Sequence, residues 1–304
     1  MISSFEILGK KRNSMVSLQK VAFEQVLELA FKYPWLQPKT GALSTLLFED
    51  CENEDQTQIV IDILGQLNYI TIQEYNGCIC NLALDIATSS LDPDKTFIVA
   101  MSADSTADSG QSVIYDLKLE LSKLEWTGYR SVNRYDQTHK VYKEFKKSKG
   151  EQVVDLVLVD NFVGSGRTVI NRVNRLKCIF DELGFPHPNI YVKVLISTTG
   201  GSDRITDENI NFASYYTVDD KILEKMYEPD QVEIKKELMR SLESKLSPFY
   251  KNRPLPSLGY DESQVAISIE NKNTPNNVFP IFWWKYYSDQ RVRNVLLHRA
   301  MDDA

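Results

Sequence analysis

The sequence predicts an α/β protein built on a mostly parallel sheet, preceded by a small α+β domain. An apolar, β-branched run at residues 153–159 is followed by a glycine-containing turn and an amphipathic helical pattern. Further apolar runs at 96–101, 189–197 and 210–218 alternate with helical patterns, as the strands of a parallel sheet do. We therefore expect one domain over residues 1–90 and a larger α/β domain over residues 91–304, which includes a C-terminal tail.

The turn after residues 153–159 is predicted to bind a phosphate group. Residues 164–168, Gly-Ser-Gly-Arg-Thr, stand between the strand and a helix that begins near Thr168. Backbone N–H groups at a helix start, together with the helix dipole, favour an anion, and glycines allow it to approach closely. Ser165 and Thr168 add hydroxyl donors, and Asp160 and Asn161 stand at the carboxyl end of the strand, where α/β sheets bind ligands. An ordinary strand–turn–helix junction is the alternative.

Two familiar phosphate-binding loops do not fit these residues. A Walker A loop needs a glycine where Asn161 stands and a lysine where Arg167 stands. A dinucleotide-binding loop needs a small residue where Val169 stands. The segment Asp-Asn-Phe-Val-Gly-Ser-Gly-Arg-Thr at 160–168 instead resembles the ribose-phosphate loop of type I phosphoribosyltransferases, and the order of elements resembles that family over about residues 91–285.

This resemblance implies roles for the loop and for the two residues before it. Residues 164–168 (Gly164, Ser165, Gly166, Arg167 and Thr168) would hold the 5′-phosphate, and Asp160 with Asn161 would face the ribose 2′- and 3′-hydroxyls. The family has a second acidic residue where Asn161 stands, and a neutral hydrogen bond contributes about 0.5–1.5 kcal/mol against about 1.5–3 for a charged one. Gly164 stands where 6-oxopurine salvage enzymes carry an acidic residue, which argues against purine salvage.

The resemblance also implies a pyrophosphate loop between residues 102 and 111. Backbone amides at Ala103, Asp104 and Ser105 would grip pyrophosphate, and Mg²⁺ bound with phosphoribosyl pyrophosphate would be held in part by Asp104 and Asp160. Carboxylates in such a loop repel pyrophosphate unless Mg²⁺ bridges them. A helix start capped by Asp108 or Ser109 is the alternative.

Residues 123–149 form a basic segment in an acidic chain. The segment has eight lysines and arginines against three acidic residues, whereas the whole chain has a net charge of −7. Related transferases carry a mobile loop here, so Arg130, Arg134 and Lys140 are candidate catalytic cations that neutralise a leaving pyrophosphate. Interleaved aromatic residues also suit RNA or single-stranded DNA, and a solvated basic face is the third alternative.

The tail contains the segment Phe279-Pro-Ile-Phe-Trp-Trp, in which Phe282 and Trp283 are candidates for a hood that holds the base of the ligand. Packing of these aromatic residues in a core is the alternative. The tail segment Asn-Thr-Pro-Asn-Asn at 273–277 and the Asp-Ser-Gly-Gln segment at 108–111 resemble phosphoribosyltransferase-like proteins of bacterial conflict systems. Some of those proteins pair this domain with a winged helix as retron effectors in antiphage defence.

The first 90 residues predict a winged-helix-like layout. Helical patterns near 17–31, 43–48 and 55–67 precede strand-like runs at 69–75 and 78–84, which flank Asn76-Gly77, a strong hairpin signal. Residues 40–94 contain ten acidic residues and no lysine or arginine. DNA binding would be repelled by this charge, so docking of a protein partner or a structural role is expected.

The composition excludes several other classes of protein. No apolar run approaches the length of a membrane span, and the four cysteines have no zinc-binding spacing, so we expect a cytoplasmic protein with no membrane contact and no zinc site. The expected function is binding of a ribose-5-phosphate ligand, either phosphoribosyl pyrophosphate or a nucleotide, by an effector of retron-type antiphage defence. Such an effector could transfer phosphoribosyl or cleave an N-glycosidic bond. A non-catalytic nucleotide sensor or nucleic-acid platform, and an ordinary nucleotide-biosynthesis enzyme, are the alternatives.

Overall fold

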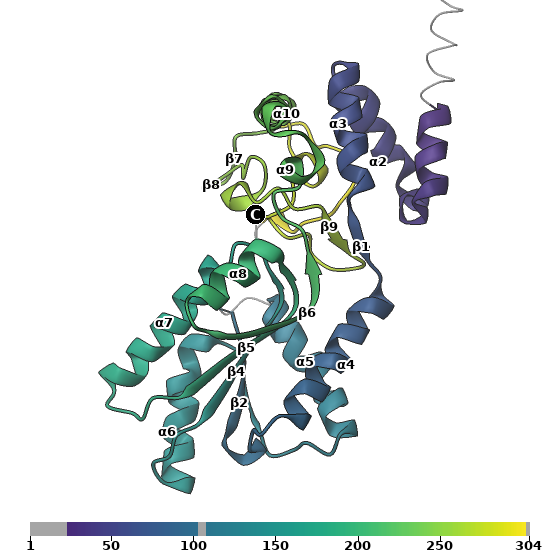
Figure 1. The fold of residues 1–304 in the computed structure, drawn as a ribbon. Coiled ribbons are helices and arrows are strands. Elements are labelled where there is room, and N and C mark those ends of the chain that lie inside the picture. The colour runs from purple at the N-terminus through teal and green to yellow at the C-terminus, as the bar shows by residue number, and fades with distance from the viewer. Residues whose placement is uncertain (1–22, 103–107, 302–304) are drawn as a thin grey trace, which may run out of the picture. The chain divides into compact units, whose positions relative to one another are not determined.

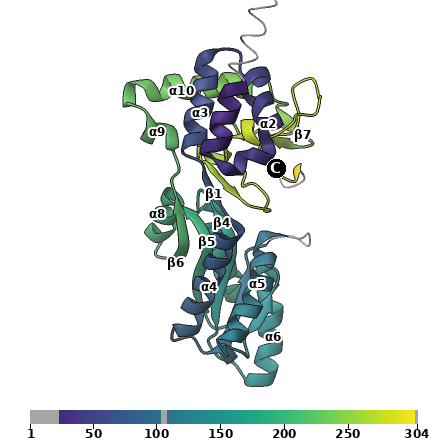
Figure 2. The ribbon, with the colours of Figure 1, turned by 90° about the vertical axis from the view of Figure 1, so that its right-hand side faces the viewer.

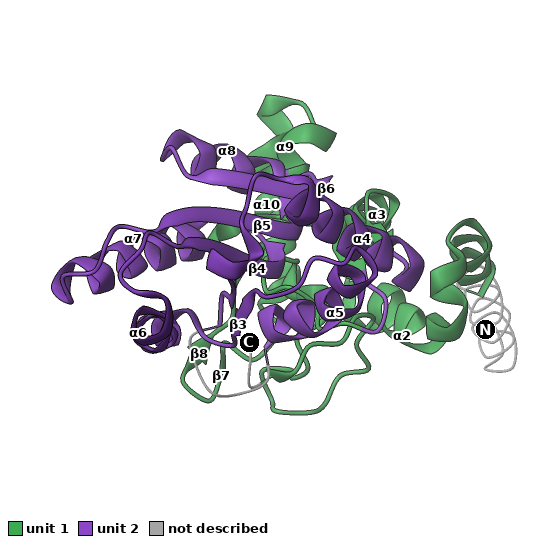
Figure 3. Ribbon diagram, turned by 90° about the horizontal axis from the view of Figure 1, so that it is seen from below, with its two compact units in different colours: residues 1–69, 222–268, 272–304 green, residues 70–221, 269–271 purple. Residues whose placement is uncertain are grey.

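The computed structural model describes residues 23–102 and 108–301. The chain divides into two compact units (Figure 3). Unit 1 comprises residues 1–69, 222–268 and 272–304, and unit 2 comprises residues 70–221 and 269–271. The predicted boundary near residue 90 therefore differs from this division, because unit 1 combines segments from both ends of the chain.

Unit 2 contains a five-stranded sheet in which every neighbouring pair of strands is parallel. The order of strands across the sheet is β3 (Arg130–Val132), β2 (Thr96–Ala100), β4 (Asp155–Val163), β5 (Asn189–Thr198) and β6 (Asn211–Val218). The predicted parallel α/β sheet is thereby confirmed, with the 153–159 run in its central strand.

Helices cover both faces of this sheet (Figure 1, Figure 3). On one face lie α4 (Ile72–Thr88) and α5 (Ser109–Lys123). On the other lie α6 (Thr138–Lys149), α7 (Arg167–Glu182) and α8 (Thr199–Asp207). Two short 3-10 turns complete the described part of unit 2, η3 (Pro93–Lys95) and η4 (Tyr135–Gln137).

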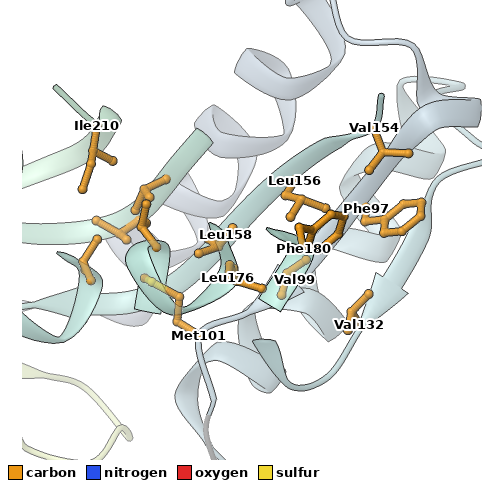
Figure 4. Close-up of a cluster of buried hydrophobic side chains, with 14 of the residues drawn as sticks. Phe97, Val99, Met101, Val132, Val154, Leu156, Leu158, Leu176, Phe180 and Ile210 are labelled. Carbon is orange, nitrogen blue, oxygen red and sulfur yellow. The ribbon is translucent and has the colours of Figure 1, made fainter. Parts of the chain in front are cut away.

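The core under α6 and α7 explains the aromatic content of the basic segment. Leu156 and Leu158 of β4 pack there with Phe97 of β2 (Figure 4). Tyr142 and Phe145 of α6 are almost completely buried in the same cluster. Alternation along β4 places every second side chain on this face. The aromatic residues of α6 therefore belong to the core, and its lysines face outward.

The predicted hairpin around Asn76-Gly77 is wrong, because these residues lie inside helix α4. Thr71 and Glu74 form a capping box, in which the Thr71 side chain accepts a hydrogen bond from the Glu74 N–H and Glu74 accepts one from the Thr71 N–H. The helix buries a stripe of residues at helical spacing: Tyr75, Cys78, Ile79, Leu82, Ala83 and Ile86. A wing is therefore absent from the described residues, and this helix covers the unit 2 sheet (Figure 2).

Unit 1 is mainly helical and irregular. Its described N-terminal part contains a helix through residues 23–32, η1 (Pro34–Lys39), α2 (Thr40–Thr45), η2 (Leu46–Asp50), α3 (Glu54–Gly65) and β1 (Asn68–Ile70). The later segments contain α9 (Ile222–Met226), α10 (Pro229–Glu243), β7 (Phe249–Tyr250), β8 (Arg253–Pro254), η5 (Tyr260–Glu262), β9 (Ile267–Ile269) and η6 (Pro280–Phe282). The predicted helices near 43–48 and 55–67 correspond to α2 with η2 and to α3. Among the described residues, no helix is both long and apolar enough to cross a membrane.

A buried ion pair joins the two ends of the chain within unit 1. Arg293 donates to the Asp50 carboxylate over 2.5 Å, and both side chains are 1% exposed. Tyr287 donates to the other carboxylate oxygen over 2.7 Å, and Arg293 also donates to the carbonyls of Trp284 and Ile281. Because a buried charge is costly unless it is paired and hydrogen-bonded, these contacts hold the C-terminal segment against the η2 turn.

Candidate functional site

Three segments of unit 2 meet at the carboxyl edge of its sheet, where parallel sheets bind ligands. Beyond the end of β2, the Met101 N–H donates to the Val159 carbonyl of β4 over 3.1 Å, and the Tyr135 N–H after β3 donates to the Ser102 carbonyl over 3.2 Å. Helix α5 begins in contact with this edge, because a Cβ added to Gly110 would lie 3.1 Å from both the Met101 nitrogen and the Val159 oxygen. These contacts hold the segments after β2 and β3, and the start of α5, at the edge of the sheet where Asp160 lies.

The predicted phosphate loop is held against the start of α8 by its carbonyl groups. Thr198 donates from Oγ1 to the Gly164 carbonyl over 2.8 Å, and Arg204 donates from Nη1 to the Ser165 carbonyl over 2.7 Å. The two backbones approach so closely that a Cβ on Gly201 would lie 1.9 Å from the Gly164 oxygen. Gly166 has a φ of 75°, in the left-handed region that favours glycine, and its Cβ would lie 2.8 Å from the Gly201 oxygen.

This attachment turns the amide groups of the loop outward. In a trans peptide the N–H points opposite to the carbonyl of the preceding residue, and the described chain has no cis peptide bond. The N–H groups of Ser165 and Gly166 therefore point away from α8. Within residues 23–102 and 108–301, neither these two groups nor the N–H of Thr168 donates to a protein acceptor, and α7 has no side-chain cap. The loop thus presents several backbone donors, as a phosphate site requires.

Asp160 lies beside this loop and is almost buried, with its side chain 14% exposed. The Ser109 hydroxyl donates to its Oδ1 over 2.6 Å, and the Asn161 N–H donates to the same oxygen over 2.8 Å. Burial raises the pKa of Asp160 to about 6, and the nearby Asp108 charge acts in the same direction, while the Ser109 hydrogen bond and Arg172 oppose the shift. A change in its surroundings can therefore alter its charge near neutral pH.

Two site residues were not predicted from the sequence. Arg172 of α7 lies 4.0 Å from the Asp160 carboxylate, and its guanidinium stacks on Tyr135 at 5.6 Å from the ring centre. The position of Arg172, one helical turn beyond Thr168, is the sequence signal that could have identified it. Tyr135 lies just before α6, in a segment where only cations were predicted to act at the site. The two residues connect the β3–α6 segment to Asp160.

The structure separates the three predicted catalytic cations. Arg130 pairs with Phe97 near the amino end of β2, about 13 Å along the strands from the row of Asp160, and it stacks on Phe145 in the core. Arg130 therefore lies away from the site, and its prediction as a catalytic cation is wrong. Arg134 lies near the carboxyl edge, but it forms a two-point ion pair with Asp136 at 2.8 and 3.0 Å.

Lys140 is exposed in the first turn of α6. The segment compared with a mobile loop of related transferases includes this helix, whose Tyr142 and Phe145 pack in the core. The aromatic hood is corrected as well. Phe282 and Trp283 are fully buried in unit 1, and the Trp283 indole N–H donates to the Val278 carbonyl over 2.9 Å. Both rings are therefore part of the core of unit 1 and do not form a hood.

The predicted pyrophosphate residues Ala103, Asp104 and Ser105 lie outside the described residues. At the start of α5, Asp108 occupies the N-cap position but makes no side-chain cap hydrogen bond, so the capping alternative is not observed in that form. No group of three or more metal-ligating side chains gathers in the described parts of the chain. The Asp160 and Asp108 carboxylates fit Mg²⁺ only if phosphate and water oxygens supply most of its ligands.

The chain is similar to several solved structures. Similar solved structures include orotate phosphoribosyltransferase from Aeropyrum pernix, with 15% identity, coverage of 48% of this chain and 71% of that one, and a TM-score of 0.28. A hypothetical protein from Neisseria gonorrhoeae with bound ppGpp has 15% identity, coverage of 50% and 85%, and a TM-score of 0.33. Orotate phosphoribosyltransferase from Mycobacterium tuberculosis, in complex with inorganic phosphate, has 10% identity, coverage of 54% and 96%, and a TM-score of 0.29.

No curated protein matches the chain at a significant level. The sequence model of the PRTase-CE family, in contrast, matches residues 47–292, which include all of unit 2 and most of unit 1. The chain therefore belongs to the PRTase-CE family, a phosphoribosyltransferase-like family.

Proposed function

We propose that the carboxyl edge of the unit 2 sheet binds a ligand that contains ribose 5-phosphate, either phosphoribosyl pyrophosphate or a nucleotide. The observation that carries this proposal is the orientation of the 164–168 loop, whose carbonyls are bound by Thr198 and Arg204 while its N–H groups face away from them. A phosphate monoester accepts hydrogen bonds from such a group of amides without any rearrangement of the loop. The hydroxyls of Ser165 and Thr168 add further donors.

In this proposal Asp160 binds the ribose. Its carboxylate accepts hydrogen bonds from the 2′- and 3′-hydroxyls once the Ser109 hydroxyl releases Oδ1, and Asn161 contributes a neutral contact. The positive charge of Arg172 lowers the pKa of Asp160 and so favours its ionised form, against the larger opposing effect of burial. Arg134 and Lys140 supply cations from the β3–α6 segment, Asp104 completes the pyrophosphate loop with Ala103 and Ser105, and Mg²⁺ supplies charge neutralisation at the pyrophosphate.

If the ligand reacts, the chemistry is dissociative cleavage at the anomeric carbon. The bond to pyrophosphate or to a base breaks as positive charge develops on the ribose ring, and an acceptor nitrogen or water then attacks that carbon. Asp160, when ionised, stabilises this charge through the ring hydroxyls. The biological role that we propose is an effector in bacterial antiphage defence of the retron type, consistent with family membership, with the acidic residues of 40–94 as a contact for a protein partner.

A non-catalytic nucleotide sensor is the second candidate. It is favoured by Asn161, because the family has a second acidic residue at this position and Asn161 carries no charge. It is also favoured by the raised pKa of Asp160, which reduces the negative charge of the remaining carboxyl group near neutral pH. Burial of the carboxylate without a strong cation partner suits binding better than stabilisation of a cationic transition state.

Calorimetric titration of phosphoribosyl pyrophosphate with Mg²⁺ tests the proposal. We expect binding by the natural protein, loss of binding in Asp160→Ala and loss in Gly166→Val, whose side chain meets the Gly201 oxygen. Gly184→Val is the matched control, because Gly184 also has a positive φ of 62° but no atom within 4 Å of an added Cβ. Absence of heat with both phosphoribosyl pyrophosphate and nucleoside monophosphates contradicts the proposal. Binding that turns over no ligand supports the sensor.

A further inference from the structure

The outer face of α6 and α7 carries a concentration of positive charge, most of which the proposed ribose-phosphate site does not use. The two helices lie side by side on one face of the unit 2 sheet, and both begin at its carboxyl edge (Figure 1). Together they contain nine lysines and arginines against three carboxylates, a local charge of +6 in a chain of net charge −7. A polyanion would therefore be attracted to this face and repelled by much of the remaining surface.

Three lysines form a single stripe along α6. Lys140, Lys143 and Lys147 follow one another at intervals of three and four residues, on the side opposite the buried Tyr142 and Phe145. We call these three residues the α6 lysine stripe; it spans about 10 Å along the helix axis. All three are exposed, and in the described parts of the chain none of them has a carboxylate partner.

Two other cations of the same helices are already engaged in ion pairs. Lys146 pairs with Glu151 at 2.7 Å, and Arg175 of α7 pairs with Glu182 at 3.1 Å. An ammonium group without a partner loses little when it binds a phosphate, whereas a paired one must first give up its carboxylate. The α6 lysine stripe is therefore available to an anion.

The chemistry beside the stripe favours a nucleic acid over a protein or a membrane. The exposed face of α7 contributes Asn171 and Asn174, which are uncharged and can donate to phosphate oxygens. No large hydrophobic side chain is exposed on α6 or α7, both of which the structure describes in full. Protein–protein interfaces bury an apolar centre, and helices that bind a membrane surface insert an apolar face into it. Nucleic-acid interfaces, in contrast, are polar and cationic.

The aromatic residues decide between single and double strands. Binding of single strands depends on bases stacking on exposed rings. Here Tyr142 and Phe145 are at most 1% exposed, Trp126 is 8% exposed, and Tyr135 stacks on Arg172. A surface with cations and amides but without exposed rings can contact a sugar–phosphate backbone, and it offers no ring on which an unpaired base could stack.

We propose that the α6 lysine stripe, together with Asn171 and Asn174, binds the backbone of double-stranded nucleic acid without sequence preference. This interaction does not rest on the ribose-phosphate site, and the two can fail separately. The affinity depends strongly on salt, because each bound phosphate releases condensed counterions.

Fluorescence anisotropy with a labelled DNA duplex of about 20 base pairs, titrated between about 50 and 200 mM salt, tests the proposal. The test variant is Lys143→Gln/Lys147→Gln, which leaves Lys140 and the loop intact. The control is Lys32→Gln/Lys118→Gln, which removes the same charge from two exposed lysines outside α6 and α7. We expect the test variant to bind about tenfold or more weakly, with a salt slope shallower by about 2, and the control to bind like the natural protein.

Several outcomes overturn the proposal. The first is that the natural protein does not bind the duplex at the lowest salt concentration. The second is an equal loss of duplex affinity in the control variant, which would show that binding depends on net charge and on no defined surface. Tighter binding of the single strand of the same sequence overturns the preference for a duplex. Displacement of the duplex by a polyglutamate peptide at equal charge concentration overturns the assignment to nucleic acid. The Gly166→Val variant separates the two sites, because we expect it to bind the duplex normally.

Discussion

The hydroxyl of Ser109 lies 2.6 Å from the carboxylate of Asp160, although the two residues are 51 positions apart in the sequence. Ser109 begins helix α5, and Asp160 lies in β4 just before the 164–168 loop. The Ser109 hydroxyl donates a hydrogen bond to a carboxylate oxygen of Asp160 that the ribose hydroxyls would also need. Binding of the ribose therefore competes with a contact that also lowers the pKa of Asp160.

Ser109→Ala tests this competition. At pH about 8, where Asp160 is ionised in either protein, we expect ribose-phosphate binding to tighten roughly two- to tenfold, because a hydrogen bond contributes about 0.5–1.5 kcal/mol net. At a pH of about 6 the gain should shrink, since loss of the hydroxyl raises the pKa of Asp160 further. Calorimetry at both pH values measures the effect. Weaker binding at the higher pH would show that Ser109 positions Asp160 and does not compete with the ligand.

The raised pKa of Asp160 predicts a pH-dependent cost to stability. The pKa is about 6 in the folded protein against an ordinary value of 3.8 for an aspartate, so between these values the folded state holds the proton more tightly than the unfolded chain does. Stability therefore falls as pH rises through this window, by up to about 3 kcal/mol. In thermal unfolding, Asp160→Asn should raise the melting temperature more at neutral pH than below pH about 4. An equal difference at both pH values contradicts the assignment.

Arg172→Gln should affect Asp160 by removing a charge 4.0 Å from its carboxylate. The pKa of Asp160 should rise, so ribose-phosphate binding should weaken near neutral pH and recover at higher pH. Tyr135→Leu is the matched control, because it removes the ring on which Arg172 stacks without removing the charge. A loss that is the same at every pH would instead indicate a purely structural role for Arg172.

Two glycine substitutions should change the stability of the protein in opposite directions. Gly201→Ala places a Cβ 1.9 Å from the Gly164 oxygen, so we expect destabilisation by about 1–3 kcal/mol and displacement of the phosphate loop. Gly77→Ala in α4 meets no atom within 4 Å and should stabilise the helix by about 0.5–1 kcal/mol. Chemical denaturation measures both changes. Destabilisation by Gly77→Ala would contradict the helical assignment of this segment.

The buried Asp50–Arg293 pair predicts strong coupling in a double-mutant cycle. Asp50→Asn or Arg293→Met alone should cost about 3–5 kcal/mol, because each leaves the partner charge buried. The double variant should cost less than the sum of the single changes. Denaturation of the four proteins gives the coupling energy. Additive effects would show that the pair is not the contact that holds the C-terminal segment.

The predictions from sequence succeeded where a local pattern and the fold required the same structure. The run at 153–159 is valine-rich, short and bounded by polar residues, and it became the central strand, with the helix following the predicted turn. The prediction failed at Asn76-Gly77, where a short hairpin signal competed with a helix of 17 residues. Six buried positions at helical spacing and a capping box outweighed one turn-forming dipeptide, and the helix packs against β5 and β6, which lie far along the chain.

Sequence spacing also could not show which cations reach the site. Arg130 and Arg134 are four residues apart, yet β3 carries the chain from the row of Phe97 to the carboxyl edge between them. A strand advances about 3.3 Å per residue, so such short separations along the chain become opposite positions on the sheet.

The sequence alone determined the local features: the parallel α/β architecture, the strand–turn–helix junction at 164–168 and the acidic residue that precedes it. These depend on side-chain periodicity and backbone freedom, which act over a few neighbouring residues. Only the tertiary structure decided which atoms surround Asp160, which aromatic residues are buried, and which segments from the two ends of the chain form unit 1. Electrostatics and packing act through space, so residues distant in sequence set the charge of Asp160 and the lysine face of α6.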